Sequence, residues 1–200
     1  MNRLVIFDLD GVLFESRDMH FDALNRALEH YGHERISYKD HMERFNGLPT
    51  STKLTMLGIA DEEAARVRNE KQAHTFGWVL RSVTIDPALV MLFTYLHEAG
   101  WQIAVASNAV TATVVGALRM LGLWKLCDFV VAGDRVVNPK PDPEMYLRCM
   151  EVCEAEPATT IIVEDSPVGC EGAKKTGALV LIVSGPADVP AVVRAAVEAA

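Results

Sequence analysis

Five short runs of apolar residues most constrain how this chain can fold. They lie at residues 3–7, 102–106, 129–132, 160–163 and 179–183. The first has no polar alternation, which is typical of a strand buried on both faces, as in a parallel sheet. Between the last four runs lie segments of helical length, at residues 109–121, 143–154 and 169–176. Strands alternating with helices predict an α/β fold in which helices cover both faces of a parallel sheet.

One long interval breaks this alternation. Residues 15–81 contain no convincing strand, but apolar residues recur there at helical spacing. Within the interval, the Gly, Pro and hydroxyl content of residues 45–53 predicts a loop. We therefore expect a Rossmann-like core of residues 1–14 and 82–200, with an α-helical cap of residues 15–81 inserted after the first strand. Such a cap would cover the sheet edge as a lid.

Charge and composition narrow the class of partner. The formal net charge is −8 and no basic run supplies a phosphate-neutralising surface, so we expect no nucleic-acid partner. No stretch approaches the roughly 20 apolar residues of a membrane helix, and no signal peptide precedes the first strand, which favours a cytoplasmic protein without a membrane partner. Cys149 and Cys153 are spaced to seat a metal, but we interpret them as buried apolar residues. The sequence indicates no particular oligomeric state.

Two aspartates, Asp8 and Asp10, come directly after the first apolar run. Side chains two residues apart in a strand point to the same side, so the two carboxylates converge. Two negative charges this close repel, so one carboxylate would be protonated unless a cation or a proton-transfer role accounts for the pair. Gly11 permits a sharp turn and brings backbone amides close to a bound group. The alternative, an Asp-rich turn that caps a helix, does not require the second carboxylate.

Further polar residues follow the later runs. Because the carboxyl ends of parallel strands share one edge, we expect them to meet above the sheet. The residues in this set are Asp8, Asp10, Ser107, Asn108, Lys140, Glu164 and Asp165. Taken separately, Ser107-Asn108 and Asp165-Ser166 could cap the helices that follow, and Lys140 could be a solvated loop lysine. Their joint position at strand ends favours a site.

This set of residues suits phosphoryl transfer. A carboxylate can attack phosphorus to give an aspartyl-phosphate, and Asp10 is placed to protonate the leaving oxygen and then to activate water. Carboxylates such as Asp8 and Asp165, with a backbone carbonyl, are ligands that Mg²⁺ accepts. The charge on the transferred group calls for a lysine, a serine hydroxyl and loop amides, which Lys140, Ser107 and the Gly11 turn supply.

Four segments together resemble the signature of the haloacid dehalogenase (HAD) superfamily. They are FDLDGVLFES at residues 7–16, ASN at 106–108, KPDP at 140–143 and VEDSPVG at 163–169. The similarity is greatest to the branch with a small helical cap, which includes phosphoglycolate phosphatases and β-phosphoglucomutase.

The resemblance implies a role for each motif residue. Asp8 would be the nucleophile and Asp10 the acid/base, both also on Mg²⁺ together with Asp165. Ser107, Asn108, Lys140 and Gly11 would bind the phosphate, and Glu164 would lie beside the metal, oriented toward Lys140 or a water. The first strand would be central, between the second and the fourth.

The cap is less well described by the resemblance. His20 matches a histidine of the sugar-phosphate members, or is an ordinary helix-face histidine. Thr50, Lys53 and Lys71 are candidate substrate contacts from the cap, with solvated helix lysines as the alternative for the latter two. Where mutase-like members carry an arginine after the cap-loop glycine, this chain reads Gly47-Leu48-Pro49-Thr50, which disfavours a mutase.

The sequence therefore predicts a Mg²⁺-dependent phosphatase of a small phosphorylated metabolite, such as a sugar phosphate. A phosphomutase, a carbon–halogen hydrolase and a non-catalytic phosphometabolite-binding protein are the alternatives.

Overall fold

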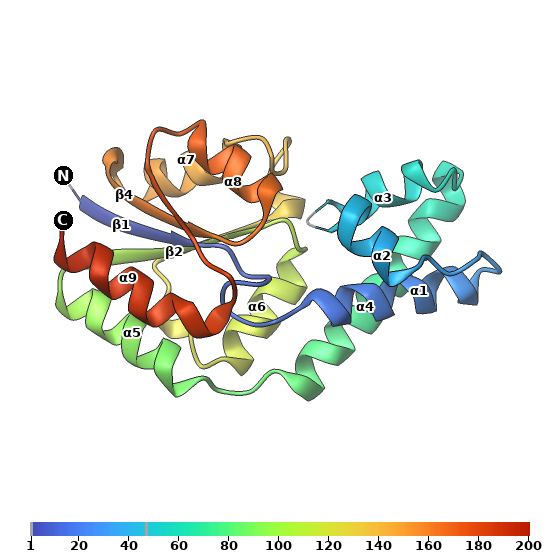
Figure 1. The fold of residues 1–200 in the computed structure, drawn as a ribbon, viewed down its shortest axis with the longest axis horizontal. Coiled ribbons are helices and arrows are strands. Elements are labelled where there is room, and N and C mark those ends of the chain that lie inside the picture. The colour runs from blue at the N-terminus through green and yellow to red at the C-terminus, as the bar shows by residue number, and fades with distance from the viewer. Residues whose placement is uncertain (1, 47) are drawn as a thin grey trace.

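A computed structural model describes residues 2–46 and 48–200; Met1 and Gly47, the latter part of the predicted cap loop, lie outside the described residues. Five parallel strands form one sheet in the order β3-β2-β1-β4-β5 (Figure 1). The strands are β1 (Asn2–Phe7), β2 (Trp101–Ser107), β3 (Phe129–Ala132), β4 (Ala155–Glu164) and β5 (Leu179–Ile182). The predicted strands and the central position of β1 are confirmed. β4 begins earlier than expected, because Ala155 pairs with Asn2 before a register shift.

Helices cover both faces of the sheet. The period-two alternation of β1 places Val5 and Phe7 in one apolar cluster and Leu4 and Ile6 in the other, all fully buried. The helices packed in the first cluster are α5 (Pro87–Glu98), α6 (Thr111–Met120) and α9 (Val189–Glu198). Those on the opposite face are α7 (Glu144–Val152) and α8 (Pro167–Lys174). The short 3-10 turns are η2 (Trp124–Leu126), η3 (Gly133–Arg135) and η4 (Pro186–Asp188).

Buried thiols contribute to the second cluster. Cys149 and Cys153 pack there beside Met145, and burial raises the pKa of both thiols. This confirms their interpretation as apolar core residues.

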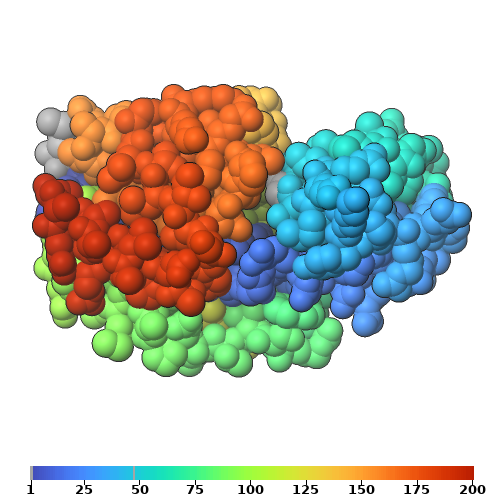
Figure 2. All heavy atoms as spheres, viewed as in Figure 1, coloured from blue at the N-terminus to red at the C-terminus, as the bar shows by residue number. Residues whose placement is uncertain are grey.

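A helical cap follows β1 and forms a separate lobe in the space-filling view (Figure 2). Its elements are α1 (Arg17–His30), α2 (Tyr38–Asp40), the π-helical η1 (His41–Phe45), α3 (Thr50–Met56) and α4 (Asp61–Ser82). The prediction of a loop through residue 53 was wrong, because α3 begins at Thr50. Leu54 is fully buried in the cap cluster with Phe45, and tertiary packing of that kind stabilises a short helix that composition alone does not indicate.

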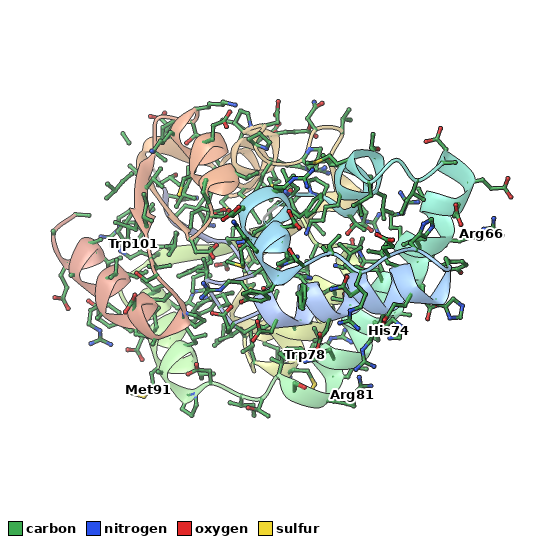
Figure 3. The ribbon with its side chains drawn as sticks, turned by 45° about the vertical axis from the view of Figure 1, so that its right-hand side comes forward. Arg66, His74, Trp78, Arg81, Met91 and Trp101 are labelled. Carbon is green, nitrogen blue, oxygen red and sulfur yellow. The ribbon has the colours of Figure 1, made fainter. Side chains whose placement is uncertain are left out.

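The long helix α4 connects the two lobes. Figure 3 follows it from Arg66 in the cap to Trp78 and Arg81 near the core. Near its C-terminal end, Val79 is buried in the sheet's apolar cluster, and the Trp78 ring stacks on Phe14 with centroids 6.4 Å apart.

Within the described ranges, no single helix is long and apolar enough to cross a membrane. Only α4 and α5 taken together, across a bend of 91°, satisfy that test of length and composition.

Candidate active site

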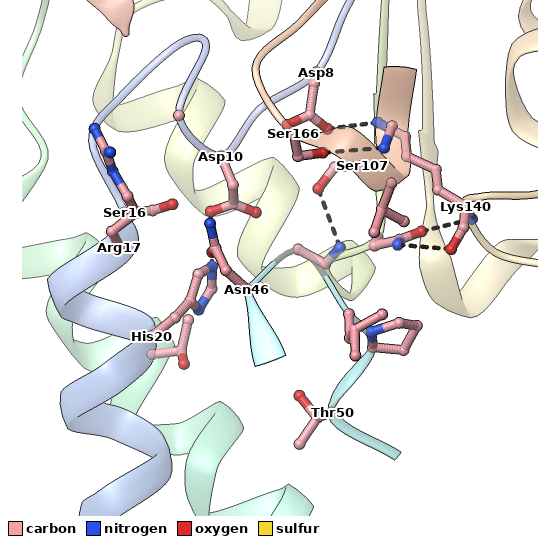
Figure 4. A pocket seen from close by; sticks show the side chains of 18 of the residues that line it. Asp8, Asp10, Ser16, Arg17, His20, Asn46, Thr50, Ser107, Lys140 and Ser166 are labelled. Carbon is pink, nitrogen blue, oxygen red and sulfur yellow. Dashed lines mark hydrogen bonds and ion pairs between the residues drawn. The ribbon is translucent and has the colours of Figure 1, made fainter. Parts of the chain in front are cut away.

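A pocket lies between the carboxyl edge of the sheet and the cap (Figure 4). The predicted site residues that line it are Asp8, Asp10, Gly11, His20, Thr50, Lys53, Lys71, Ser107, Asn108, Lys140 and Asp165. The remaining predicted residue, Glu164, is fully buried at the end of β4. The topology therefore brings all the predicted polar residues of the core to one edge, and the cap adds its own polar side chains to the same pocket.

Lys140 connects three strand ends through one buried ammonium group. Its Nζ donates to Asp8 Oδ1 at 2.6 Å, to the Ala106 carbonyl at 2.8 Å and to Glu164 Oε1 at 2.5 Å. The side chain is 3% exposed, so the alternative of a solvated loop lysine is wrong.

The charges of this cluster depend on one another. Burial raises the pKa of Asp8 well above its usual range, although the neighbouring Lys140 opposes this rise. Burial by itself lowers the pKa of Lys140, but the attraction of Asp8 and Glu164 outweighs it and raises that pKa. Lys140 is therefore a fixed cation that holds one oxygen of Asp8 in place.

Tyr146 contacts both Glu164 and Lys140 in this cluster, and the sequence analysis did not predict it. Its hydroxyl lies 2.5 Å from Glu164 Oε1 and 3.2 Å from the Gly169 carbonyl oxygen, and the Lys140 ammonium lies 4.9 Å from its ring centroid. A Cβ at Gly169 would lie only 2.1 Å from the Glu164 carboxylate, so glycine is required there. The available signal was a tyrosine on the apolar face of α7, because a buried phenol needs a hydrogen-bond partner.

Asn108 positions the Lys140 main chain. Its side chain accepts a hydrogen bond from the Lys140 N–H at 3.0 Å and donates to the Lys140 carbonyl at 3.3 Å. Ser107 is 1% exposed, and its hydroxyl accepts from the Ala109 N–H at 3.0 Å. Neither side chain caps α6, which begins at Thr111 without a side-chain cap, so capping is wrong for this pair.

Ser166, in contrast, does cap the helix that follows it. Its Oγ accepts from the Gly169 N–H at 3.0 Å at the start of α8. The neighbouring Asp165 makes no such bond and instead lines the pocket.

Gly11 makes room for Asp165. Its φ is +81°, a region that favours glycine, and a Cβ there would lie 2.1 Å from an Asp165 carboxylate oxygen. The Gly11 N–H, which we expected to face a bound phosphate, donates instead to the Phe14 carbonyl at 2.9 Å.

Asp10 belongs to a chain of hydrogen bonds that reaches into the cap. His20 Nε2 lies 2.9 Å from Asp10 Oδ1, and the Lys71 ammonium lies 3.1 Å from His20 Nδ1. A protonated lysine can only donate, so Nδ1 accepts from it and Nε2 carries the hydrogen that Asp10 accepts. Burial raises the pKa of Asp10, but the proximity of His20 outweighs this and lowers that pKa to about 2. Burial and then Lys71 lower the pKa of His20, which favours the neutral ring.

The acidic residues at the sheet edge fit a divalent cation. Oxygens of Asp8, Glu164 and Asp165 all lie within 4.8 Å of one another. Asp165 Oδ1 is buried and has no hydrogen-bond partner among the described residues, and burial with the nearby Glu164 and Asp10 raises the pKa of Asp165 to about 6. Both oxygens of Glu164 are already engaged, Oε1 by Lys140 and Tyr146 and Oε2 by the Ser166 hydroxyl, whereas Lys140 holds only one oxygen of Asp8. The carboxylates left for a hard cation are therefore those of Asp8 and Asp165.

The cap lysines are buried, so their interpretation as solvated helix lysines is wrong. Lys53 on α3 is 5% exposed and Lys71 on α4 is 4% exposed. Burial and the nearby Lys71 lower the pKa of Lys53 to about 7, and burial lowers that of Lys71 to about 8. Pocket residues that sequence reasoning missed are Ser16, Arg17, Asn46, Gln72 and Thr75. Ser16 ends the first quoted motif but was given no role there, and no local pattern marks the others, which reach the pocket through the packing of the cap.

Known proteins are similar to this chain over most of its length. The family model described as "haloacid dehalogenase-like hydrolase" matches residues 5–183. The chain is 32% identical to a phosphorylated carbohydrates phosphatase of Thermotoga maritima, over 86% of this chain and 81% of that protein. It is 28% identical to the fructose-1-phosphate phosphatase YqaB of Escherichia coli, over 86% and 92% respectively.

A solved structure shows the same fold. CbbY from Rhodobacter sphaeroides in complex with phosphate superimposes with a TM-score of 0.83 at 22% identity, covering 92% of this chain and 87% of that one. The strand order, the inserted cap and the match to the family model over most of the sequence lead to one conclusion. The chain belongs to the haloacid dehalogenase-like hydrolase family.

Proposed function

We propose that this protein is a Mg²⁺-dependent phosphatase that hydrolyses a small phosphate monoester, a sugar phosphate or similar metabolite, through an aspartyl-phosphate on Asp8. The observation that carries this proposal is the different surroundings of the two aspartates. Lys140 holds one oxygen of Asp8, whereas His20 holds Asp10. Two carboxylates in one pocket with different partners are suited to separate roles, one as nucleophile and one as acid/base. The phosphatase names of the relatives from Thermotoga maritima and Escherichia coli support the same class of substrate.

Asp8 is the group that attacks phosphorus. Lys140 binds Asp8 Oδ1, which leaves the second carboxylate oxygen to form the bond to phosphorus as the bond to the leaving oxygen breaks. The Lys140 ammonium and the Ser107 hydroxyl face the same volume and would stabilise the charge on the transferred group. Held by Asp8, Asp165 and the Asp10 carbonyl, Mg²⁺ would supply further positive charge toward the phosphate oxygens.

Asp10 moves the proton in each half of the reaction. The hydrogen bonds from Lys71 through His20 to Asp10 form a path along which Asp10 gains a proton as Lys71 loses one. With Asp10 at a pKa of about 2 and Lys71 at about 8, the transfer is unfavourable in the free site, so the negative charge that develops on the leaving oxygen must drive it. Asp10 then gives the proton to the departing alkoxide, and the resulting carboxylate takes a proton from the water that hydrolyses the aspartyl-phosphate.

Phosphate release from a panel of sugar, glycolyl, glycerol and nucleotide monoesters, measured with Mg²⁺, tests the proposal. Wild type should release phosphate and carry acid-stable label from a ³²P substrate, and Asp8→Asn should do neither. Asp10→Asn should slow both half-reactions while Mg²⁺ still binds. Glu98→Gln, at an exposed position on α5 remote from the pocket, is the matched control. Equal activity of Asp8→Asn and wild type would refute the proposal.

A phosphomutase is the second candidate, because the cap supplies more positive charge than its loop sequence indicates. The prediction against a mutase depended on the missing arginine after Gly47, yet Lys53 and Lys71 line the same pocket. Isomerisation of a sugar phosphate without net phosphate release would favour this candidate.

A further inference from the structure

The cap side of the pocket contains a buried cation that the proposed chemistry does not use. Lys53 lines the pocket with only 5% of its surface exposed. The described residues form no salt bridge with it. Lys140 by comparison has two carboxylate partners, and Lys71 contacts His20. Lys53 is therefore a buried ammonium that forms no salt bridge with the described residues; the charge of Asp10 acts on it, but that carboxylate already bonds His20.

Nothing in the packing of α3 requires a charge at this position. The neighbouring Leu54 fills the cap cluster, and an apolar residue at position 53 would avoid the cost of desolvating an ammonium group. A buried charge of this kind is stabilised when an opposite charge enters and pairs with it. In this pocket the entering species is the substrate.

Lys53 belongs to the cap side of the pocket, where its charge acts on His20 and His41. Figure 4 shows Thr50, the first residue of α3, across the pocket from Asp8, and Lys53 lies one turn further along the same helix. The phosphoryl group that reacts with Asp8 is served by Lys140 and Ser107 at the sheet edge. The charge that pairs with Lys53 therefore belongs to another part of the substrate.

We propose that the substrate carries a second acidic group, a phosphate or a carboxylate, remote from the phosphoryl group that Asp8 accepts, and that Lys53 binds it. This inference rests on the proposed phosphatase function and specifies its substrate class. Thr50 and Asn46, which line the same side of the pocket, supply neutral polar groups beside the ammonium. The specificity arises because a substrate without the second anion leaves the Lys53 charge buried and unpaired.

Two pairs of matched substrates test the inference and separate the two kinds of anion. Glycerol 3-phosphate and 3-phosphoglycerate differ in a carboxylate, and fructose 1-phosphate and fructose 1,6-bisphosphate differ in a phosphate. For wild type, kcat/KM should favour the doubly acidic member of at least one pair by about 10- to 100-fold, as expected for one charge-assisted hydrogen bond. The pair that shows the preference identifies the anion.

Variants at position 53 assign the preference to the ammonium group. Lys53→Met should reduce the ratio of kcat/KM within the responsive pair by about tenfold or more, and Lys53→Arg should retain most of it. Lys53→Gln is the second neutral variant, and Lys39→Met, at an exposed position on α2, is the matched control. Circular dichroism shows that each variant is folded before it is assayed.

The possible failures are distinguishable. If no monoester releases phosphate, the proposed phosphatase function fails, and this inference with it. If phosphate is released but neither pair shows a preference, or Lys53→Met and Lys53→Gln keep the wild-type ratio, the inference about the second anion is refuted while the phosphatase function stands.

Discussion

Replacing Lys53 by methionine should make the protein more stable, by an amount that depends on pH. Methionine keeps an unbranched side chain in the cap but removes the ammonium group. The physical basis is the pKa of Lys53, which burial and Lys71 lower from an ordinary value of 10.5 to about 7. Between these two values the unfolded chain binds a proton at this lysine that the folded protein does not, so the free energy of unfolding falls as the pH falls.

The magnitude follows from the two pKa values. A fall from 10.5 to about 7 corresponds to about 5 kcal/mol, at about 1.4 kcal/mol for each tenfold change in the dissociation constant. The full cost is present below pH 7 and absent above pH 10.5. At about pH 9 roughly 2 kcal/mol of it remains. The advantage of Lys53→Met over wild type should therefore be about 3 kcal/mol larger at about pH 6 than at about pH 9.

The groups that face Lys53 are the same in both proteins. They are Lys71 on α4, His20 on α1, His41 in η1 and Asp10 in the loop after β1. Their own titrations largely cancel in the comparison of variant with wild type. The repulsion between Lys53 and Lys71 is already part of the lowered pKa of Lys53, so it adds nothing further to the stabilisation.

Urea unfolding followed by far-ultraviolet circular dichroism, at both pH values and without Mg²⁺ or phosphate, measures this difference. The slope of the unfolding free energy with urea should be unchanged, and only the midpoint should move. Lys39→Met, at an exposed position, should show no pH-dependent gain. A gain for Lys53→Met that is absent, or equal at the two pH values, would refute the assignment of a buried and depressed ammonium.

Three further results are expected. Tyr146→Phe removes a hydroxyl that bonds the buried Glu164, so the free energy of unfolding should fall by about 1–3 kcal/mol, and an unchanged urea midpoint would contradict this. Gly169→Ala places a Cβ against the Glu164 carboxylate and should cost about 1–3 kcal/mol or more, whereas Gly185→Ala, where nothing lies within 4 Å, should be nearly neutral in the same assay. Added Mg²⁺ should raise the thermal midpoint more at about pH 7.5 than at about pH 5, because Asp165, with a pKa raised to about 6, must lose its proton to bind the ion. An equal rise at the two pH values, with EDTA as the metal-free reference, would exclude Asp165 as a ligand.

Local sequence signals were sufficient for the α/β architecture and for the core of the site. Apolar runs that end in polar residues mark both a buried strand and the edge at which its polar neighbours emerge. The parallel topology then brings Asp8, Ser107 and Asp165 together without further information. Helical periodicity also indicated the cap, since an apolar face is a property of one segment alone.

Contacts between distant segments were decided only by the tertiary structure. Position 53 shows this most clearly, because its surroundings suggested a loop, and only the packing of Leu54 reveals a helix that buries Lys53 in the pocket. In the same way, the side chain of Asn108 bonds a main chain 32 residues away, which no local pattern encodes. Periodicity determines which face of a segment is apolar, but the neighbour that this face meets depends on how all the segments pack, and that packing sets the charge state of the pocket.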